Sequence, residues 1–282
     1  MRKSPHAPRR PRKLIGLLLL AVGLIGSLLS VTSVAAQPAR NDNTKAPKPT
    51  VVLVHGAFAD ASSWNGVIGR LRRDGFPVIA PANPERDLAG DSAYIASVMA
   101  TISGPIILVG HSYGGAVITN AAIGSPNVKA LVYIAGFALA PGESLLDINM
   151  QYPNSQLASA TLPRPYPLPD GTSGTDLYIS PDKFQAVFAQ DLSSATTATL
   201  AATQRPLSFT ALTDKSAGAA WQTIPSWYMV ATKDHAIDPA AERAMAARAG
   251  AHTVEVSSSH AVLISHASAV TNMIEAAARA AA

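Results

Sequence analysis

One serine of this sequence stands where it could act as a nucleophile. Residues 110–114 read Gly-His-Ser-Tyr-Gly and directly follow the apolar run Ile106–Val109. A buried strand that turns sharply into a helix needs glycines beside the apex, because side chains there would collide with the backbone. Such a turn would present Ser112 above the sheet edge, at a helix N-terminus that favours developing negative charge. The pentapeptide alone also fits an ordinary glycine-rich turn, so partner residues must be sought elsewhere.

A serine hydroxyl near neutral pH needs a base to take its proton, and histidine is the usual one. Six histidines follow residue 36. His260 comes four residues after the expected strand Thr253–Val256, behind the three serines 257–259. This small polar loop could carry the imidazole over the strand edge to Ser112. Other histidines lie within the turn itself, in the loop after the first strand, before a strand or at the start of the last helix. The alternative for His260 is an ordinary surface histidine.

A carboxylate is needed to orient this histidine. Asp234 lies just past the expected strand Trp227–Ala231, at the carboxyl end where functional groups collect in open α/β sheets. Asp238 precedes a proline and is explained as the N-cap of the next helix. Asp234 has no such structural explanation. The chain order Ser112, Asp234, His260 is the order expected when the nucleophile lies on a strand-to-helix turn.

Two backbone N–H groups complete the expected site, because acyl transfer creates an oxyanion that needs hydrogen-bond donors. One is the amide of Tyr113, next to the nucleophile. The other is the amide of Ala57, in the loop 55–58 (His-Gly-Ala-Phe), whose glycine allows close approach to the site. Removing one such donor typically costs about 2.7–4 kcal/mol of barrier. Phe58 and Trp221 are expected to line an apolar substrate pocket, although core packing explains such aromatics equally well.

The elements that must position these groups alternate along the chain from residue 50 onward. The strand runs show no polar alternation, which indicates strands covered on both faces and therefore a mainly parallel sheet. Strands and helices that take turns predict right-handed crossovers and a doubly wound α/β fold. The expected strands are Val51–Val54, Val78–Ala80, Ile106–Val109, Leu131–Ile134, Trp227–Ala231 and Thr253–Val256. The expected helices cover residues 63–73, 91–102, 113–123, 239–249 and 267–281.

Residues 139–222 interrupt this rhythm. They contain eight prolines and show helical signals only near 181–191 and 194–204. We expect a small cap inserted over the carboxyl edge of the sheet, where loops build binding sites in such folds. Its apolar content favours packing over the alternative of a disordered insertion.

Basic residues crowd the start of the chain. The formal net charge is +4, but the 36 residues at the N-terminus hold six Lys and Arg and no acid, so the remainder carries −2. The basicity therefore gives no support for a nucleic-acid partner.

The first 36 residues have the order of a secretory signal peptide. Basic residues come first, then the apolar run Leu14–Leu29, then small residues up to Ala36. The alternative is an uncleaved anchor, but a run of about 16 residues is shorter than the roughly 20 that a spanning helix needs. We expect cleavage near Ala36, a flexible linker at 37–49 and a folded domain at 50–282. The mature protein would be periplasmic or extracellular, without stable membrane insertion; the export route stays open.

The sequence contains no cysteine, which excludes thiol catalysis, disulfides and thiolate metal sites. No motif with the spacing of metal ligands occurs either, so we expect neither a metal nor another cofactor.

Several segments together resemble the α/β-hydrolase superfamily: VVLVHGAF, GHSYGG, the Asp after the sixth strand and the SSSH loop. More narrowly, HGAF, NPERDLAGD and YIAGFALAPGES resemble the small-capped esterases, a group with plant methyl-salicylate and methyl-jasmonate esterases and plant hydroxynitrile lyases. The resemblance covers residues 50–281. The lyases carry Thr and Lys where this sequence has Gly56 and Ala261, which argues against cyanohydrin cleavage. A serine on the turn excludes the aspartate-nucleophile route of epoxide hydrolases.

These observations predict an exported serine hydrolase that cleaves carboxylic esters of small or medium hydrophobic substrates through an acyl-enzyme. Two alternatives stay open. One is a lyase or cofactor-free perhydrolase that uses the same triad, and the other is a non-catalytic ligand-binding protein with the same shell. The sequence leaves the natural substrate and the oligomeric state open.

Overall fold

A six-stranded sheet, with strand order β2-β1-β3-β4-β8-β9, forms the centre of the fold. The computed structural model describes residues 47–281, so the expected signal peptide and most of the expected linker lie outside the described residues. Every neighbouring pair of strands in the sheet is parallel. The strands are β1 (Thr50–Val54), β2 (Val78–Ile79), β3 (Ile106–Ser112), β4 (Val128–Gly136), β8 (Ser226–Ala231) and β9 (His252–Val256).

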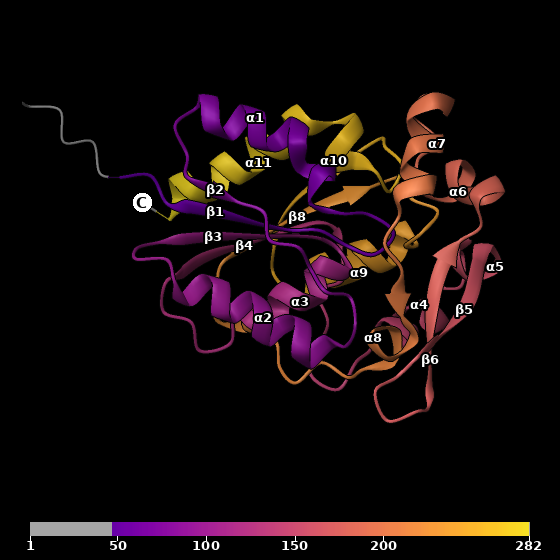
Figure 1. Cartoon of the computed structure of the whole chain (residues 1–282). Coiled ribbons are helices and arrows are strands. Elements are labelled where there is room, and N and C mark those ends of the chain that lie inside the picture. The colour runs from indigo at the N-terminus through magenta and orange to yellow at the C-terminus, as the bar shows by residue number, and fades with distance from the viewer. Residues whose placement is uncertain (1–46, 282) are drawn as a thin grey trace, which may run out of the picture. The chain divides into compact units, whose positions relative to one another are not determined.

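Two hydrophobic cores, one on each face of the sheet, explain the absence of polar alternation. On β3, Ile106 and Leu108 belong to one core, and Ile107 and Val109 belong to the other. Helices cover both faces, as Figure 1 shows, with α1 and α11 on one side and α2, α3 and α9 on the other. These helices are α1 (Asn65–Arg73), α2 (Leu88–Ala100), α3 (Tyr113–Ala121), α9 (Pro239–Arg248) and α11 (Ala267–Ala280). The short elements η1 (Ala61–Trp64) and α10 (Val262–Ser265) precede α1 and α11.

The expected doubly wound α/β fold is therefore confirmed, with each expected strand and helix of the sheet layer present. The two edge strands differ from the four between them, because β2 and β9 contain no buried residue and Val254 of β9 is 50% accessible.

The segment between β4 and β8, residues 137–225, is called the cap segment here. Its elements α5, β5, β6, α6 and α7 lie beyond the carboxyl ends of the strands, at the right of Figure 1. A three-stranded antiparallel sheet, ordered β5-β6-β7, and several short helices build it. The elements are α4 (Leu145–Gln151), α5 (Leu157–Ala160), β5 (Thr161–Pro167), β6 (Ser173–Ile179), α6 (Pro181–Phe188), α7 (Ser194–Thr203), β7 (Leu207–Ser208), α8 (Phe209–Thr213) and η2 (Ala220–Gln222).

Sequence patterns identify only α6 and α7 within the cap segment. The strand β5 is hidden because Pro163, Pro165 and Pro167 occupy alternate positions, and proline normally argues against a strand. Alternate residues of a strand direct their backbone N–H groups to the same side. Since β5 is an edge strand, its prolines fit at the positions that turn away from β6.

The helix α4 is also missed, although its start carries a recognisable signal. Ser144 and Asp147 form a capping box, in which the serine side chain accepts from the Asp147 N–H and the aspartate accepts from the Ser144 N–H. The helix has only two turns, too few to show a clear apolar period.

Among the described residues, no helix is long and apolar enough to cross a membrane.

Substitution of Gly114 by alanine is expected to destabilise the fold. A Cβ atom there would lie 2.8 Å from the carbonyl oxygen of His55 and even closer to that of Val54, and backbone atoms of a central strand cannot give way. Overpacking of this kind costs typically about 1–3 kcal/mol, occasionally more. Gly69→Ala is the matched control, because a Cβ at this position of α1 meets nothing within 4 Å and alanine favours a helix. Urea unfolding midpoints measure both; a Gly114→Ala variant as stable as wild type would contradict the expectation.

Candidate active site

Ser112 lies at the apex of a sharp turn between β3 and α3. Its φ of 53° and ψ of −123° are unfavourable for a residue with a side chain, and the strand and helix that flank it hold it there. The side chain is almost buried, with 7% of the residue exposed. The turn predicted from the pentapeptide is therefore present, and Gly114 lies against the backbone of β1 as the steric argument requires.

The loop after β1 is pressed against this turn. A Cβ atom on Gly56 would lie 2.5 Å from the Cβ of Ser112 and 2.7 Å from the carbonyl oxygen of His111. Only glycine permits that approach, which brings the next residue, Ala57, to the cavity that Ser112 lines. Among residues 47–281, neither the Ala57 nor the Tyr113 amide N–H has a hydrogen-bond acceptor. Both expected oxyanion donors thus lie beside the serine and are free to bind a ligand.

Asp234 and His260 are brought together from two neighbouring strands. The Oδ2 atom of Asp234 lies 2.5 Å from Nδ1 of His260, and both side chains are buried. The other oxygen, Oδ1, accepts from the N–H groups of Ala236 at 2.6 Å and Ile237 at 2.9 Å. Because the imidazole donates from Nδ1 to the carboxylate, its Nε2 is left as the proton acceptor. Asp238 accepts from the Ala240 N–H and caps α9, as predicted.

A small cavity joins these groups. It has a volume of about 20 Å³ and is lined by Ser112, His260 and both residues that carry the free amides. Space of this size holds about one water molecule. Its further polar lining residues are Asn149 and Tyr113, and the hydroxyl of Tyr113 donates to Asp91 at 2.7 Å. The other lining residues are Phe58, Phe137, Leu145, Leu157, Leu207, Leu212, Ala236 and Ile237.

The two aromatic residues expected to line the pocket differ in position. Phe58 lines the cavity and adopts a φ of 61°. Trp221 lies outside it, which corrects the expectation: its indole N–H donates to the carbonyl oxygen of Leu139 at 2.9 Å. The N–H of a buried tryptophan usually has a hydrogen-bond acceptor. In Trp221 this bond fixes Leu139, at the start of the cap segment.

His111, within the turn, supports the base. It is fully buried, and its Nε2–H donates to the backbone carbonyl of His260 at 3.0 Å. Burial, followed by the proximity of His260, holds the pKa of His111 well below its usual value. His111 is therefore neutral and fixes the base through its backbone.

His55 and two residues that sequence reasoning did not single out anchor the loop after β1. The Nε2 atom of His55 accepts from the Asn83 N–H at 2.9 Å, while Nδ1 lies 3.0 Å from the Gly56 carbonyl and 3.2 Å from Oε1 of Glu85. Burial lowers the pKa of His55 to about 4, so its ring is neutral. Burial also raises the pKa of the Glu85 carboxyl well above its ordinary value. The only signal for Asn83 and Glu85 was their place in the NPERDLAGD segment.

A second carboxyl group lies behind Asp234. Glu242, on α9, is fully buried, and its Oε2 accepts from the Ala231 N–H at 3.0 Å. Burial first, and then the charge of Asp234, raise the pKa of Glu242 well above its usual value. In its protonated form, Glu242 adds no second negative charge beside Asp234. A helical glutamate carries no sequence signal for this role.

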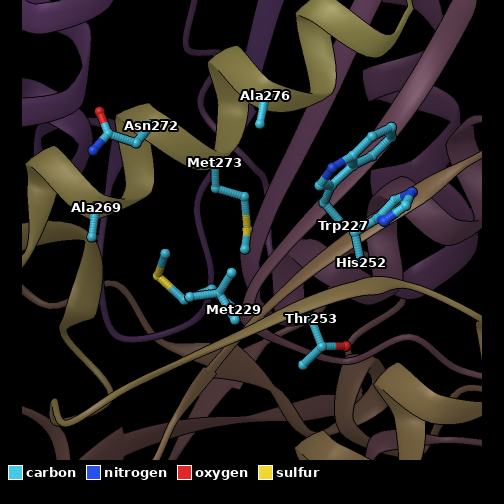
Figure 2. A pocket seen from close by; sticks show the side chains of 9 residues that line it. Trp227, Met229, His252, Thr253, Ala269, Asn272, Met273 and Ala276 are labelled. Atoms are coloured by element: carbon cyan, nitrogen blue, oxygen red, sulfur yellow. The ribbon is translucent and has the colours of Figure 1, made fainter.

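A larger cavity, of about 480 Å³, lies between β8, β9 and α11 and is lined by none of Ser112, Asp234 or His260. Figure 2 shows the rings of Trp227 and His252 beside each other, with their centroids 4.9 Å apart, and the side chains of Met229 and Met273 nearby. His252 begins β9, at the end of the strand opposite to His260. Within residues 47–281, no group of three or more His, Asp or Glu side chains is placed to hold a metal ion.

The buried Glu242 makes stability depend on pH. An unfolded glutamate releases its proton near pH 4.5, whereas the folded protein retains it, so wild-type stability should fall as pH rises above that value. Glutamine in its place has an oxygen that can accept from the Ala231 N–H, and it carries no titrating proton. Between pH 5 and 7, Glu242→Gln should therefore gain stability relative to wild type by up to about 1.4 kcal/mol per pH unit.

Urea unfolding of both proteins at the two pH values measures this difference. Glu255→Gln is the matched control on β9, because its exposed ion pair with Arg243 lowers the pKa of Glu255 and gives it no gain with rising pH. If Glu242→Gln differs from wild type by the same amount at both pH values, the carboxyl is ionised in the fold.

The comparisons with known proteins agree with this architecture. The chain is 34% identical over 108 residues to the carbendazim hydrolyzing esterase of Nocardioides sp. (strain SG-4G), a match over 34% of this chain and 45% of that protein. It is 30% identical over 105 residues to the pyrethroid hydrolase of Sphingobium wenxiniae, covering 33% and 37% of the two chains. The chain thus matches less than half the length of these relatives.

Among solved structures, polyneuridine aldehyde esterase is similar, with a TM-score of 0.71 and 20% identity over 81% of this chain and 98% of that chain. The model of the alpha/beta hydrolase family matches residues 51–272, from β1 into α11. With the parallel sheet and the serine turn at its carboxyl edge, this match shows that the chain belongs to the alpha/beta hydrolase family.

Proposed function

We propose that this protein is an exported serine hydrolase that cleaves carboxylic esters of small or medium hydrophobic substrates. One observation carries the proposal: a strained serine, a buried histidine–aspartate pair and two unpaired backbone N–H groups converge on one cavity. A purely structural turn would not need all three. The relatives named for hydrolysis of carbendazim and of pyrethroids support the same reaction class.

In the proposed reaction, the hydroxyl oxygen of Ser112 attacks the ester carbonyl carbon while His260 takes the hydroxyl proton at Nε2. The oxyanion that forms accepts hydrogen bonds from the amides of Ala57 and Tyr113. The carbon–oxygen bond to the alcohol then breaks, and His260 gives its proton to the departing alkoxide. Water attacks the acyl-enzyme by the same route, which releases the acid and restores the serine. Asp234 holds the imidazole in the required tautomer throughout.

The lining of the cavity supports hydrophobic substrates. Nine of its side chains are apolar and belong to the loop after β1, to the cap segment and to the turn after β8. The cavity of about 20 Å³ is too small for an ester, so the cap segment must move for a substrate to bind.

Export is proposed from the N-terminal sequence alone. Expression of the full chain with its leader in a bacterial host should release a mature protein whose first residue is Gln37. Mass spectrometry of the secreted or periplasmic fraction measures the cleavage, and a full-length protein retained in the membrane would contradict it.

Substitutions at the serine and the acid test the catalytic proposal. Ser112→Ala removes the nucleophile and is expected to lower kcat on p-nitrophenyl butyrate by a factor on the order of a million. Asp234→Asn favours the wrong tautomer of His260 and should cost a factor on the order of 10⁴. The matched control is Asp238→Asn, because asparagine caps a helix as well as aspartate and full activity is expected.

A fluorophosphonate should label wild type at Ser112 and leave Ser112→Ala unlabelled. Absence of labelling and of turnover across esters of varied acyl length and alcohol would favour a non-catalytic ligand-binding protein. Release of cyanide or peroxide-dependent halogenation without ester turnover would favour the lyase or the perhydrolase.

A further inference from the structure

A short part of the cap segment, residues 186–191, contacts the loops that carry both Asp234 and His260. These residues, called the brace here, form the end of α6 and the turn that follows it. We infer that the brace positions the acid and the base for catalysis, and that Asp191 is its decisive residue. The inference rests on the proposed function, because it assigns a task within that reaction.

Asp191 binds the loop just before the base. Its Oδ2 accepts from the hydroxyl of Ser258 at 2.9 Å and from the backbone N–H of Ser259 at 3.1 Å. Its Oδ1 accepts from the hydroxyl of Ser259 at 2.5 Å. Both serines are completely buried. Three hydrogen bonds donated to one carboxylate therefore fix the two residues that precede His260.

The brace also holds the residue after the base and the base itself. The carbonyl of Phe188 accepts from the Ala261 N–H at 3.0 Å. The ring of Phe188 packs edge-on against the imidazole of His260, with centroids 4.9 Å apart. The brace therefore contacts His260 itself and the residues on both sides of it.

The same residues reach the loop of the acid. The carbonyl oxygen of Ala186 accepts from Nδ1 of His235 at 2.8 Å, and the side-chain amide of Gln190 donates to the carbonyl of Lys233. These two contacts lie on either side of Asp234. The brace therefore connects the loop of Asp234 to the loop of His260, in addition to the hydrogen bond between these two side chains.

Asp191 suits this task because it is charged at neutral pH. Burial raises the pKa of its carboxyl, but the hydrogen bonds from Ser259 and Ser258 outweigh that effect, so the pKa lies below its ordinary value. The residue as a whole is exposed, which keeps the charge hydrated while both oxygens reach the buried serines. Hydrogen bonds to a charged acceptor are roughly twice as strong as neutral ones.

A contact that merely attached the cap segment to the sheet would affect stability or substrate affinity. A positioning contact affects the chemical step, because a displacement of about 1 Å in a catalytic group can cost about 100-fold in rate. A positioning role predicts a lower kcat per active site with little change in KM. A role in attachment alone predicts a change in KM or stability with kcat per active site unchanged.

The test compares Asp191→Ala with Asp170→Ala, a matched exposed aspartate in the β5–β6 turn of the same cap segment. Labelling by a fluorophosphonate, carried to completion, counts the folded active sites of each protein. For p-nitrophenyl butyrate, Asp191→Ala should show kcat per site lowered by about 10- to 100-fold with KM within about twofold of wild type. Asp191→Asn, which retains one acceptor oxygen, should have a kcat per site between those of Asp191→Ala and wild type. Asp170→Ala should have the kcat per site of wild type.

A double-mutant cycle keeps the inference falsifiable if Asp191→Ala folds poorly. Ser259→Ala removes one bond to Asp191 and leaves the backbone bond in place. If Asp191 acts through Ser259, Asp191→Asn should cost less in the Ser259→Ala background than in wild type. The inference would be overturned if the effects of Asp191→Asn and Ser259→Ala on kcat per site were fully additive. It would also be overturned if the Asp191 variants had a lower melting temperature and an unchanged kcat per site.

The proton on Nδ1 of His260 gives a readout that needs no substrate. Its downfield NMR signal should shift or broaden in Asp191→Ala and stay in place in Asp170→Ala. An unchanged signal in Asp191→Ala would overturn the inference. Absence of labelling and ester turnover in wild type would instead overturn the proposed function, and the NMR comparison would still decide whether the brace orients the histidine.

Discussion

Around Ser112, three stretches of backbone approach so closely that no side chain fits between them. They are the loop after β1, the end of β3 and the first turn of α3, and glycines at 56, 110 and 114 occupy the points of contact. The position of the nucleophile therefore follows from backbone packing. The same packing brings Ala57 to the serine, so the oxyanion donors and the nucleophile share one cause. A rigid frame of this kind holds donors in place before charge develops, which is where electrostatic catalysis gains most.

Behind this frame, several buried titratable side chains are neutral. Glu85 and Glu242 are buried and favour their protonated forms, and His55 and His111 are neutral because burial lowers their pKa values. His55, His111 and Glu242 make hydrogen bonds without adding charge near the reacting atoms. Donors meet both oxygens of the buried Asp234. The supporting charge of Asp191 stays at the surface, where water solvates it.

The sequence predicts the sheet layer and the residues at its carboxyl edge well, because both follow local rules. Apolar runs identify the parallel strands, and the positions of Asp234 and His260 follow from the strands that precede them. The cap segment was less accessible to such reasoning. The prolines of β5 disguise an edge strand, and the sequence does not show that the indole N–H of Trp221 binds the carbonyl of Leu139 and lies outside the pocket. The roles of Glu242 and Asp191 depend on contacts across 11 and 67 residues of sequence, which no local pattern reports.

The cavity over Ser112 has room for about one water molecule, so substrate binding depends on how often the cap segment opens. If only a small fraction of molecules is open at any moment, every substrate is bound with an apparent affinity reduced by that fraction, whatever its own contacts contribute. Substrates of similar bulk would then share one common penalty, set by the cap segment rather than by the pocket. Substitutions on its outer surface that favour the open state would improve the apparent affinity for all of them alike, and selectivity among esters would be left to the apolar lining and to Asn149.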